Sequence, residues 1–73
     1  MYADIIYVIV ASKGDRREFW AAATPANKAA AEVQRSLQNG WTTKFTGWRL
    51  SSEKCAELKM QVDSVRKLKQ LPR

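Results

Sequence analysis

The sequence predicts a single small α+β domain with the element order β-β-α-β-α. Three features indicate this fold: an apolar, β-branched run near the N-terminus, a turn-forming cluster after it, and later segments with apolar residues spaced three and four apart. A right-handed crossover through the first helix would place the third strand beside the first. We therefore expect a three-stranded mixed sheet of order 2-1-3 with both helices packed on one face. The domain would comprise residues 1–73, with Pro72 and Arg73 frayed.

The first two strands are expected to form a hairpin. Residues 5–10 are all β-branched or aromatic, which is typical of a strand covered on both faces. Residues 12–15 form a turn in which Gly14 can take positive φ, and residues 16–23 return as the second strand. A loop of two or four residues gives one register, and a loop of three residues swaps it. In the first register, Ile6, Val8, Val10, Phe19 and Ala21 share one face, and Ile5, Tyr7, Ile9, Glu18, Trp20 and Ala22 share the other.

The first helix is expected to begin after Thr24, whose hydroxyl can cap it, with Pro25 at the first helical position. Its inward stripe is mostly alanine, which lets a helix approach a sheet closely, and Gly40 supplies a left-handed stop. Residues 41–50 are then a third strand with large apolar residues on both alternating phases. A bulge at Gly47 would return these residues to one face, whereas a plain strand would leave aromatic residues on both faces.

A second helix is expected to begin near the capping residue Ser51 and to run to Leu68, with the lone Cys55 buried on its apolar side. Residues 62–64 offer an alternative break, because Asp63 can cap a fresh turn and give two short helices. The basic C-terminal residues complement the dipole of this helix. Contact with phosphate or with an acidic partner is the alternative role for them.

Composition excludes several classes of function. Lys and Arg number 13 against 7 Asp and Glu, and the formal net charge of +6 favours anionic partners. The chain has no His, one Cys and no Gly-rich phosphate loop, so no catalytic, cofactor-binding or metal-binding residues are predicted and the protein is not expected to be an enzyme. The longest apolar run, residues 5–11, is too short to span a bilayer or to form a signal peptide. These features favour a cytoplasmic protein.

Two helices can cover only one face of a three-stranded sheet, and the face that would stay open suggests a partner. The aliphatic face suits the helices, so Tyr7 and Trp20 would lie on the open face. We expect this face to bind a second copy of the chain, giving a homodimer, or to bind another protein. The interface candidates are Ile5, Tyr7, Ile9 and Trp20.

Binding of single-stranded nucleic acid is the alternative function for this sheet. Aromatic side chains can stack on unpaired bases while basic side chains neutralise phosphates. The nucleic-acid candidates are Lys13, Arg16, Arg17, Lys44 and Arg49. Ile5 and Ile9 favour the homodimer, because a protein interface is aliphatic at its centre, whereas a stacking surface needs exposed aromatic side chains. No motif in the sequence specifies a biological role or a physiological partner.

Overall fold

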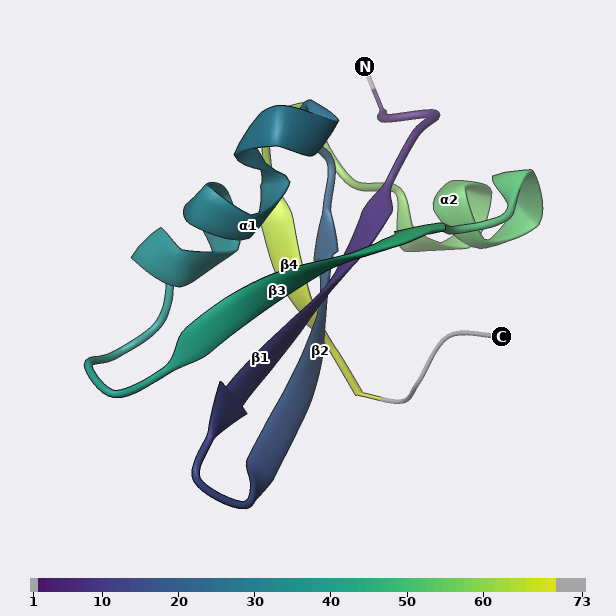
Figure 1. The fold of residues 1–73 in the computed structure, drawn as a ribbon. Helices are drawn as coiled ribbons and strands as arrows, with labels where there is room; N and C mark the ends of the chain where they lie inside the picture. The colour runs from purple at the N-terminus through teal and green to yellow at the C-terminus, as the bar shows by residue number, and fades with distance from the viewer. Residues whose placement is uncertain (1, 70–73) are drawn as a thin grey trace.

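The computed structural model describes residues 2–69, which fold into one antiparallel sheet and two helices (Figure 1). The elements are β1 (Tyr7–Lys13), β2 (Arg16–Ala22), α1 (Ala26–Arg35), β3 (Thr42–Arg49), α2 (Ser52–Leu58) and β4 (Val65–Leu68). Their order in the sheet is β3-β1-β2-β4. The expected neighbours of the first strand are therefore confirmed, but within the described residues the sheet has four strands instead of three, and all its pairs are antiparallel.

The β1–β2 hairpin has the first of the two registers considered above. Val8 pairs with Ala21, and Lys13 pairs with Arg16, which leaves a two-residue loop at Gly14 and Asp15. Gly14 has a φ of 58°, and Asp15 has no positive φ, as in a type II′ turn. This loop length fixes which side chains of the two strands share a face.

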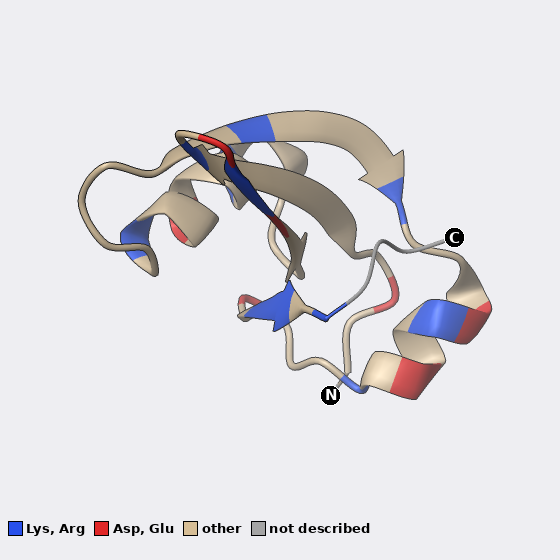
Figure 2. Cartoon of the chain, turned by 90° about the horizontal axis from the view of Figure 1, so that it is seen from below, with Lys and Arg blue, Asp and Glu red and all other residues tan. Residues whose placement is uncertain are grey.

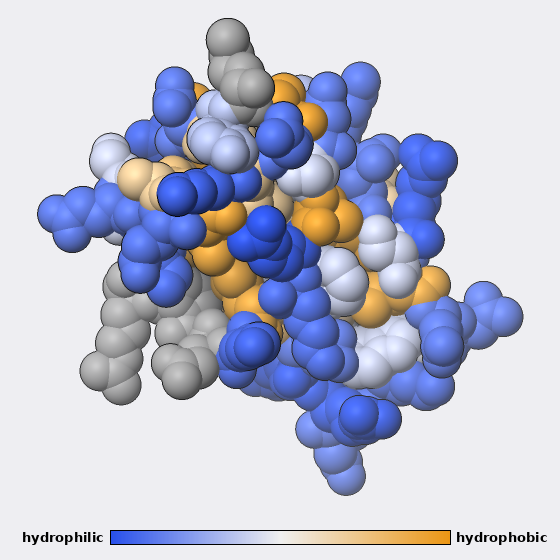
Figure 3. Space-filling view, turned by 180° about the vertical axis from the view of Figure 1, so that it is seen from behind, coloured by the Kyte–Doolittle hydropathy of each residue, from blue (hydrophilic) through white to orange (hydrophobic). Residues whose placement is uncertain are grey.

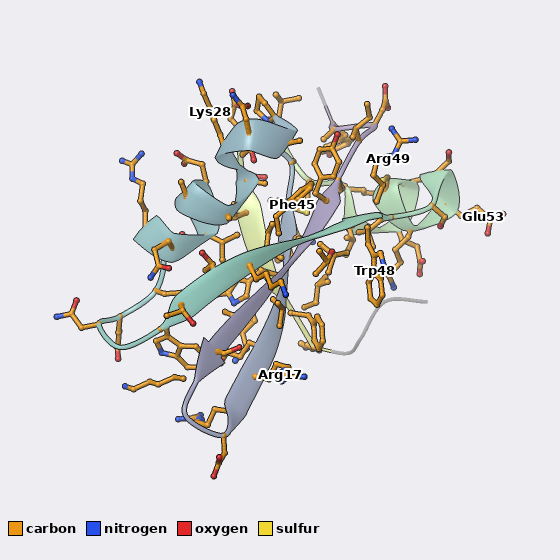
Figure 4. All side chains as sticks on the ribbon, viewed as in Figure 1. Arg17, Lys28, Phe45, Trp48, Arg49 and Glu53 are labelled. Atoms are coloured by element: carbon orange, nitrogen blue, oxygen red, sulfur yellow. The ribbon has the colours of Figure 1, made fainter. Side chains whose placement is uncertain are left out.

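Strand β3 carries aromatic side chains on both faces of the sheet. Phe45 pairs with Ile9, and Arg49 pairs with Tyr7. The chain therefore advances four residues in β3 where it advances two residues in β1, so β3 contains two extra residues here. The irregularity thus inserts an even number of residues and preserves the side-chain alternation. The Phe45 ring lies 5.4 Å from that of Tyr7, whereas Trp48 points away from the other side of the sheet (Figure 4). The bulge does not bring the aromatic residues to one face.

The segment expected to complete a long second helix is a strand. Helix α2 ends at Leu58, where Lys59 takes a left-handed conformation with a φ of 50°. Strand β4 then pairs with β2, so neither the continuous helix nor a second short helix is formed. Residues three apart share one face of a helix but lie on opposite faces of a strand. Accordingly, Val65 packs in the cluster under α1, and Leu68 packs in the cluster on the other face.

The two helices lie on opposite faces of the sheet, so the prediction that both pack on one face is wrong. Val33 of α1 belongs to the same buried cluster as Ile9 and Ala22. Cys55 of α2 belongs to a separate cluster with Ala21. Because Ala21 and Ala22 are neighbours in β2, their side chains point to opposite faces. Two thin cores therefore share the central strands, which explains why β1 is apolar on both faces.

Helix ends confirm one capping prediction and correct another. The Ser51 hydroxyl accepts a hydrogen bond of 3.1 Å from the Lys54 N–H and caps α2 as expected, and Cys55 is buried. Helix α1 has Pro25 as its N-cap residue, without a side-chain cap bond, so Thr24 does not cap it. Proline lacks an N–H, and this position needs none. The residues expected to fray, together with positions 70 and 71, lie outside the described residues.

Much of the surface is polar, with apolar areas visible between charged side chains when the molecule is seen from behind (Figure 3). The exposed large apolar side chains are Tyr2, Ile5, Phe45, Trp48 and Val62. Within residues 2–69, no helix is both long and apolar enough to cross a membrane. Exposed aromatic and aliphatic side chains at single positions are ordinary, so only their grouping with charges carries information.

Candidate interaction surface

The face that carries Tyr7 and Trp20 is covered by α1, so the prediction that it stays open is wrong. Ile9 is fully buried at the centre of this face, and Tyr7 and Trp20 are half-buried against the same cluster. Ile5 precedes β1 and is 51% exposed. Ala29 and Val33 of α1 are buried in this cluster, and the small alanine side chain allows the helix to sit close to the sheet. The four interface candidates therefore do not form one exposed surface.

A polar network occupies the edge of the α1 face. The indole Nε1 of Trp20 donates a 3.2 Å hydrogen bond to the Glu18 carboxylate, and the Lys67 ammonium lies 3.0 Å from its other oxygen. The Lys67 hydrogen bond lowers the pKa of Glu18 below its ordinary value, and the Trp20 hydrogen bond adds to this effect against the opposing desolvation. The network joins β2 to β4, so we interpret it as structural.

Glu18→Gln is expected to lower the free energy of unfolding by about 1 kcal/mol at neutral pH, since Lys67 is largely exposed and solvent screens the pair. Because folding lowers the pKa of Glu18, its contribution is present above the ordinary glutamate pKa and is lost as pH falls through the folded-state value. Urea unfolding near pH 7 and near pH 3 should show the wild-type advantage shrinking with acid. An advantage that grows in acid would contradict this assignment.

Figure 2 shows that Lys and Arg residues are distributed over strands and helices of the chain. The strand registers divide the five predicted nucleic-acid candidates between the two faces of the sheet. Arg17 pairs with Ser12, and Lys44 pairs with Val10, which places both basic residues on the face opposite α1. The other three candidates, Lys13, Arg16 and Arg49, lie on the α1 face by the same registers. The Arg16 guanidinium there lies 6.0 Å from the centre of the Trp41 ring, a cation–π distance.

We define the open face as the exposed part of the sheet face on which α2 also packs, formed by Val10, Arg17, Phe19, Lys44 and Trp48. Phe19 also packs against the buried cluster that contains Cys55 of α2. Lys44, Val10 and Phe19 are consecutive partners across β3, β1 and β2, so their side chains form one row. Arg17 lies two residues before Phe19 on the same face. In Figure 4, Trp48 lies below the β3 ribbon, whereas Phe45 and Arg49 lie above it.

Exposure and charge distinguish the open face from the α1 face. Arg17 and Lys44 are exposed, Trp48 is 53% exposed, and Val10 and Phe19 are half-buried. None of the five residues is acidic, and Glu18 points to the other face. An exposed aromatic side chain on the same face as two cations that form no ion pair within residues 2–69 can combine stacking with neutralisation of negative charge. Phe19 was missed as a candidate because both helices were expected on its face, and Trp48 was missed because its strand had been assigned to neither face. Helix α2 does lie on this face, but Trp48 remains 53% exposed.

Comparison with known proteins adds no assignment, since no protein-family model, curated protein or solved structure matches this chain. Residues 2–69 hold no group of three or more Cys, Asp or Glu side chains arranged to bind a metal ion. The side chains of the open face are therefore the remaining guide to function.

Proposed function

We propose that this domain binds single-stranded nucleic acid on the open face. The observation that carries the proposal is the exposed Trp48 on the same face as Lys44 and Arg17. The indole would stack on an unpaired base, the half-buried Phe19 would offer a second apolar contact, and the two cations would pair with phosphates. The formal net charge of +6 adds a long-range attraction for a polyanion.

Stacking favours a single strand over a duplex. A base inside a duplex is already stacked on its neighbours and presents only its edges in the grooves. The row from Lys44 to Phe19 spans three adjacent strands, or about 10 Å at the usual strand spacing. A surface of this width suits a short stretch of extended strand, a few nucleotides long.

Self-association through the open face is less compatible with its charges. A two-fold axis through this face would bring Arg17 and Lys44 close to the same residues of the second copy, and like charges across an interface are unfavourable. Neutralising them requires an anionic partner. This charge pattern favours a polyanion over a second copy of the chain, and the four interface candidates from the sequence do not form one exposed surface.

Titration of a fluorescently labelled single-stranded oligonucleotide at increasing salt tests the proposal. With two phosphate contacts, the logarithm of the association constant should fall with the logarithm of salt concentration with a slope of about −1.4. The double variant Arg17→Gln, Lys44→Gln should bind more weakly and with a smaller slope. The matched control is Lys28→Gln, Arg49→Gln, which removes two exposed cations from the α1 side (Figure 4).

Three results would reject the proposal. The first is an absence of binding at about 50 mM salt, where phosphate contacts are strong. The second is equal affinity for a duplex of the same sequence. The third is equal weakening by the control variant, because that result would indicate attraction by net charge without a defined site.

A further inference from the structure

A second surface feature lies apart from the open face, where the N-terminal segment enters β1. It is an open groove of about 370 Å³, with apolar walls from Ile5, Tyr7, Pro25 and Val62. Ile5 and Val62 are 51% and 53% exposed, so the walls present apolar surface to solvent. The volume falls in the lower part of the range of sites that bind small molecules or single side chains.

The groove is also the place where acidic side chains gather in this basic chain. Among residues 2–69, three carboxylates form ion pairs, those of Glu18, Glu32 and Glu57. Of the acidic residues without an ion pair in this range, Asp4 and Asp63 line the groove, and no Lys or Arg does. Arg49 pairs with Tyr7 in the sheet register but forms no ion pair with either aspartate. The groove therefore combines apolar walls with local negative charge.

The backbone fixes one side of the groove. The Asp63 N–H donates a 2.8 Å hydrogen bond to the Ala23 carbonyl, and the Ala23 N–H donates to the Ser64 carbonyl at 2.9 Å. Asp63 takes a left-handed conformation with a φ of 68°, which Asp and Asn adopt more readily than most residues. These bonds hold the backbone of the turn beside the end of β2, and with it the point from which the Asp63 side chain extends.

We propose that this groove binds a peptide segment in which an apolar side chain stands next to lysine or arginine. The apolar side chain would lie between Ile5, Tyr7 and Val62, and the flanking cations would pair with Asp4 and Asp63. A second copy docked groove to groove is disfavoured, because the two-fold axis would bring four carboxylates together. Charge complementarity therefore points to a basic partner segment, and the inference is independent of the proposed nucleic-acid binding.

Amide chemical-shift mapping by NMR on the full chain provides the test. The probe is the capped peptide Gly-Lys-Leu-Lys-Gly, which should give saturable shifts at the amides of Ile5, Tyr7 and Val62. One comparison peptide replaces leucine by serine, and the other replaces both lysines by glutamate. Both comparison peptides should bind at least about tenfold more weakly, since each lacks one half of the complementary chemistry.

Matched variants separate the groove from net charge. Asp4→Asn, Asp63→Asn should weaken binding of the lysine peptide by about tenfold, and asparagine keeps the left-handed turn accessible. The control Asp15→Asn, Glu53→Gln makes the same charge change at exposed acidic positions outside the groove and should leave binding unchanged. Ile5→Ser should weaken binding, while Trp48→Ser, at a position of similar exposure, should not.

The inference is overturned if the lysine peptide shifts no groove amides, if the glutamate peptide binds as well, or if both double variants weaken binding equally. Failure of the nucleic-acid proposal would appear instead in the Arg17 and Lys44 variants. Each proposal can therefore be rejected without affecting the other.

Discussion

Ile9→Glu is expected to unfold the domain, whereas Ile5→Glu is expected to leave it folded. Ile9 has no exposed surface and lies beneath α1 with Val33. Truncating such a side chain to alanine costs about 2–5 kcal/mol, and an unpaired buried carboxylate adds a desolvation penalty. A small domain has a total stability of only about 5 kcal/mol or slightly more, so the glutamate variant should lose its cooperative unfolding transition. Circular dichroism during urea unfolding measures the difference.

Ile5→Glu is the matched control. It makes the same chemical change four residues earlier in the chain, at a position where the side chain is 51% exposed. Its effect on the free energy of unfolding should be within about 0.5 kcal/mol. From the sequence, both isoleucines are predicted interface residues. A folded Ile9→Glu protein that had merely changed its oligomeric state would restore that earlier interpretation and contradict the position of α1.

Trp48→Ala is expected to weaken binding of a single-stranded oligonucleotide by about tenfold to a hundredfold. Loss of base stacking on one aromatic side chain corresponds to about 1–3 kcal/mol. The side chain is 53% exposed, so the stability of the fold should change little. Fluorescence anisotropy with a labelled oligonucleotide measures the affinity, and urea unfolding of the same sample confirms that the fold is intact.

Phe45→Ala and Trp48→Phe are the control variants for Trp48→Ala. Phe45 lies in the same strand but on the α1 face, where its ring contacts Tyr7. Its removal should reduce stability modestly and leave affinity unchanged, because no base would stack there. Trp48→Phe keeps a π face and should retain most of the affinity. Equal losses in Phe45→Ala and Trp48→Ala would place the binding surface elsewhere.

The candidate site was only partly predictable. Arg17 and Lys44 were both proposed from composition, but nothing local separates them from Lys13, Arg16 and Arg49. The strand registers make that division, because they decide which side of the sheet each residue faces. For the strand that carries Trp48, the sequence left open whether the aromatic residues share one face or lie on both, and the importance of Trp48 depends on where the helices pack.

Local chemistry determined the features that involve neighbours in the chain. Gly14 supplies the positive φ of the hairpin turn as expected, although the sequence left the loop length, and with it the register, open. The Ser51 hydroxyl caps the helix that follows it. The uniformly apolar first strand indicated cover on both faces, and its neighbour β3 followed from the handedness of the crossover. Each of these features depends on backbone preference or on rules that need no distant partner.

Only the tertiary structure decided the secondary structure of residues 59–69 and the face of the sheet on which each helix packs. Val65 and Leu68 have a spacing that fits one face of a helix, but the free edge of β2 supplies backbone partners, and the two side chains then reach different cores. Likewise, Tyr7 and Trp20 suggested an exposed face until the small side chains of α1 allowed close packing over them. In both cases long-range burial and pairing outweigh a local pattern that fits either outcome.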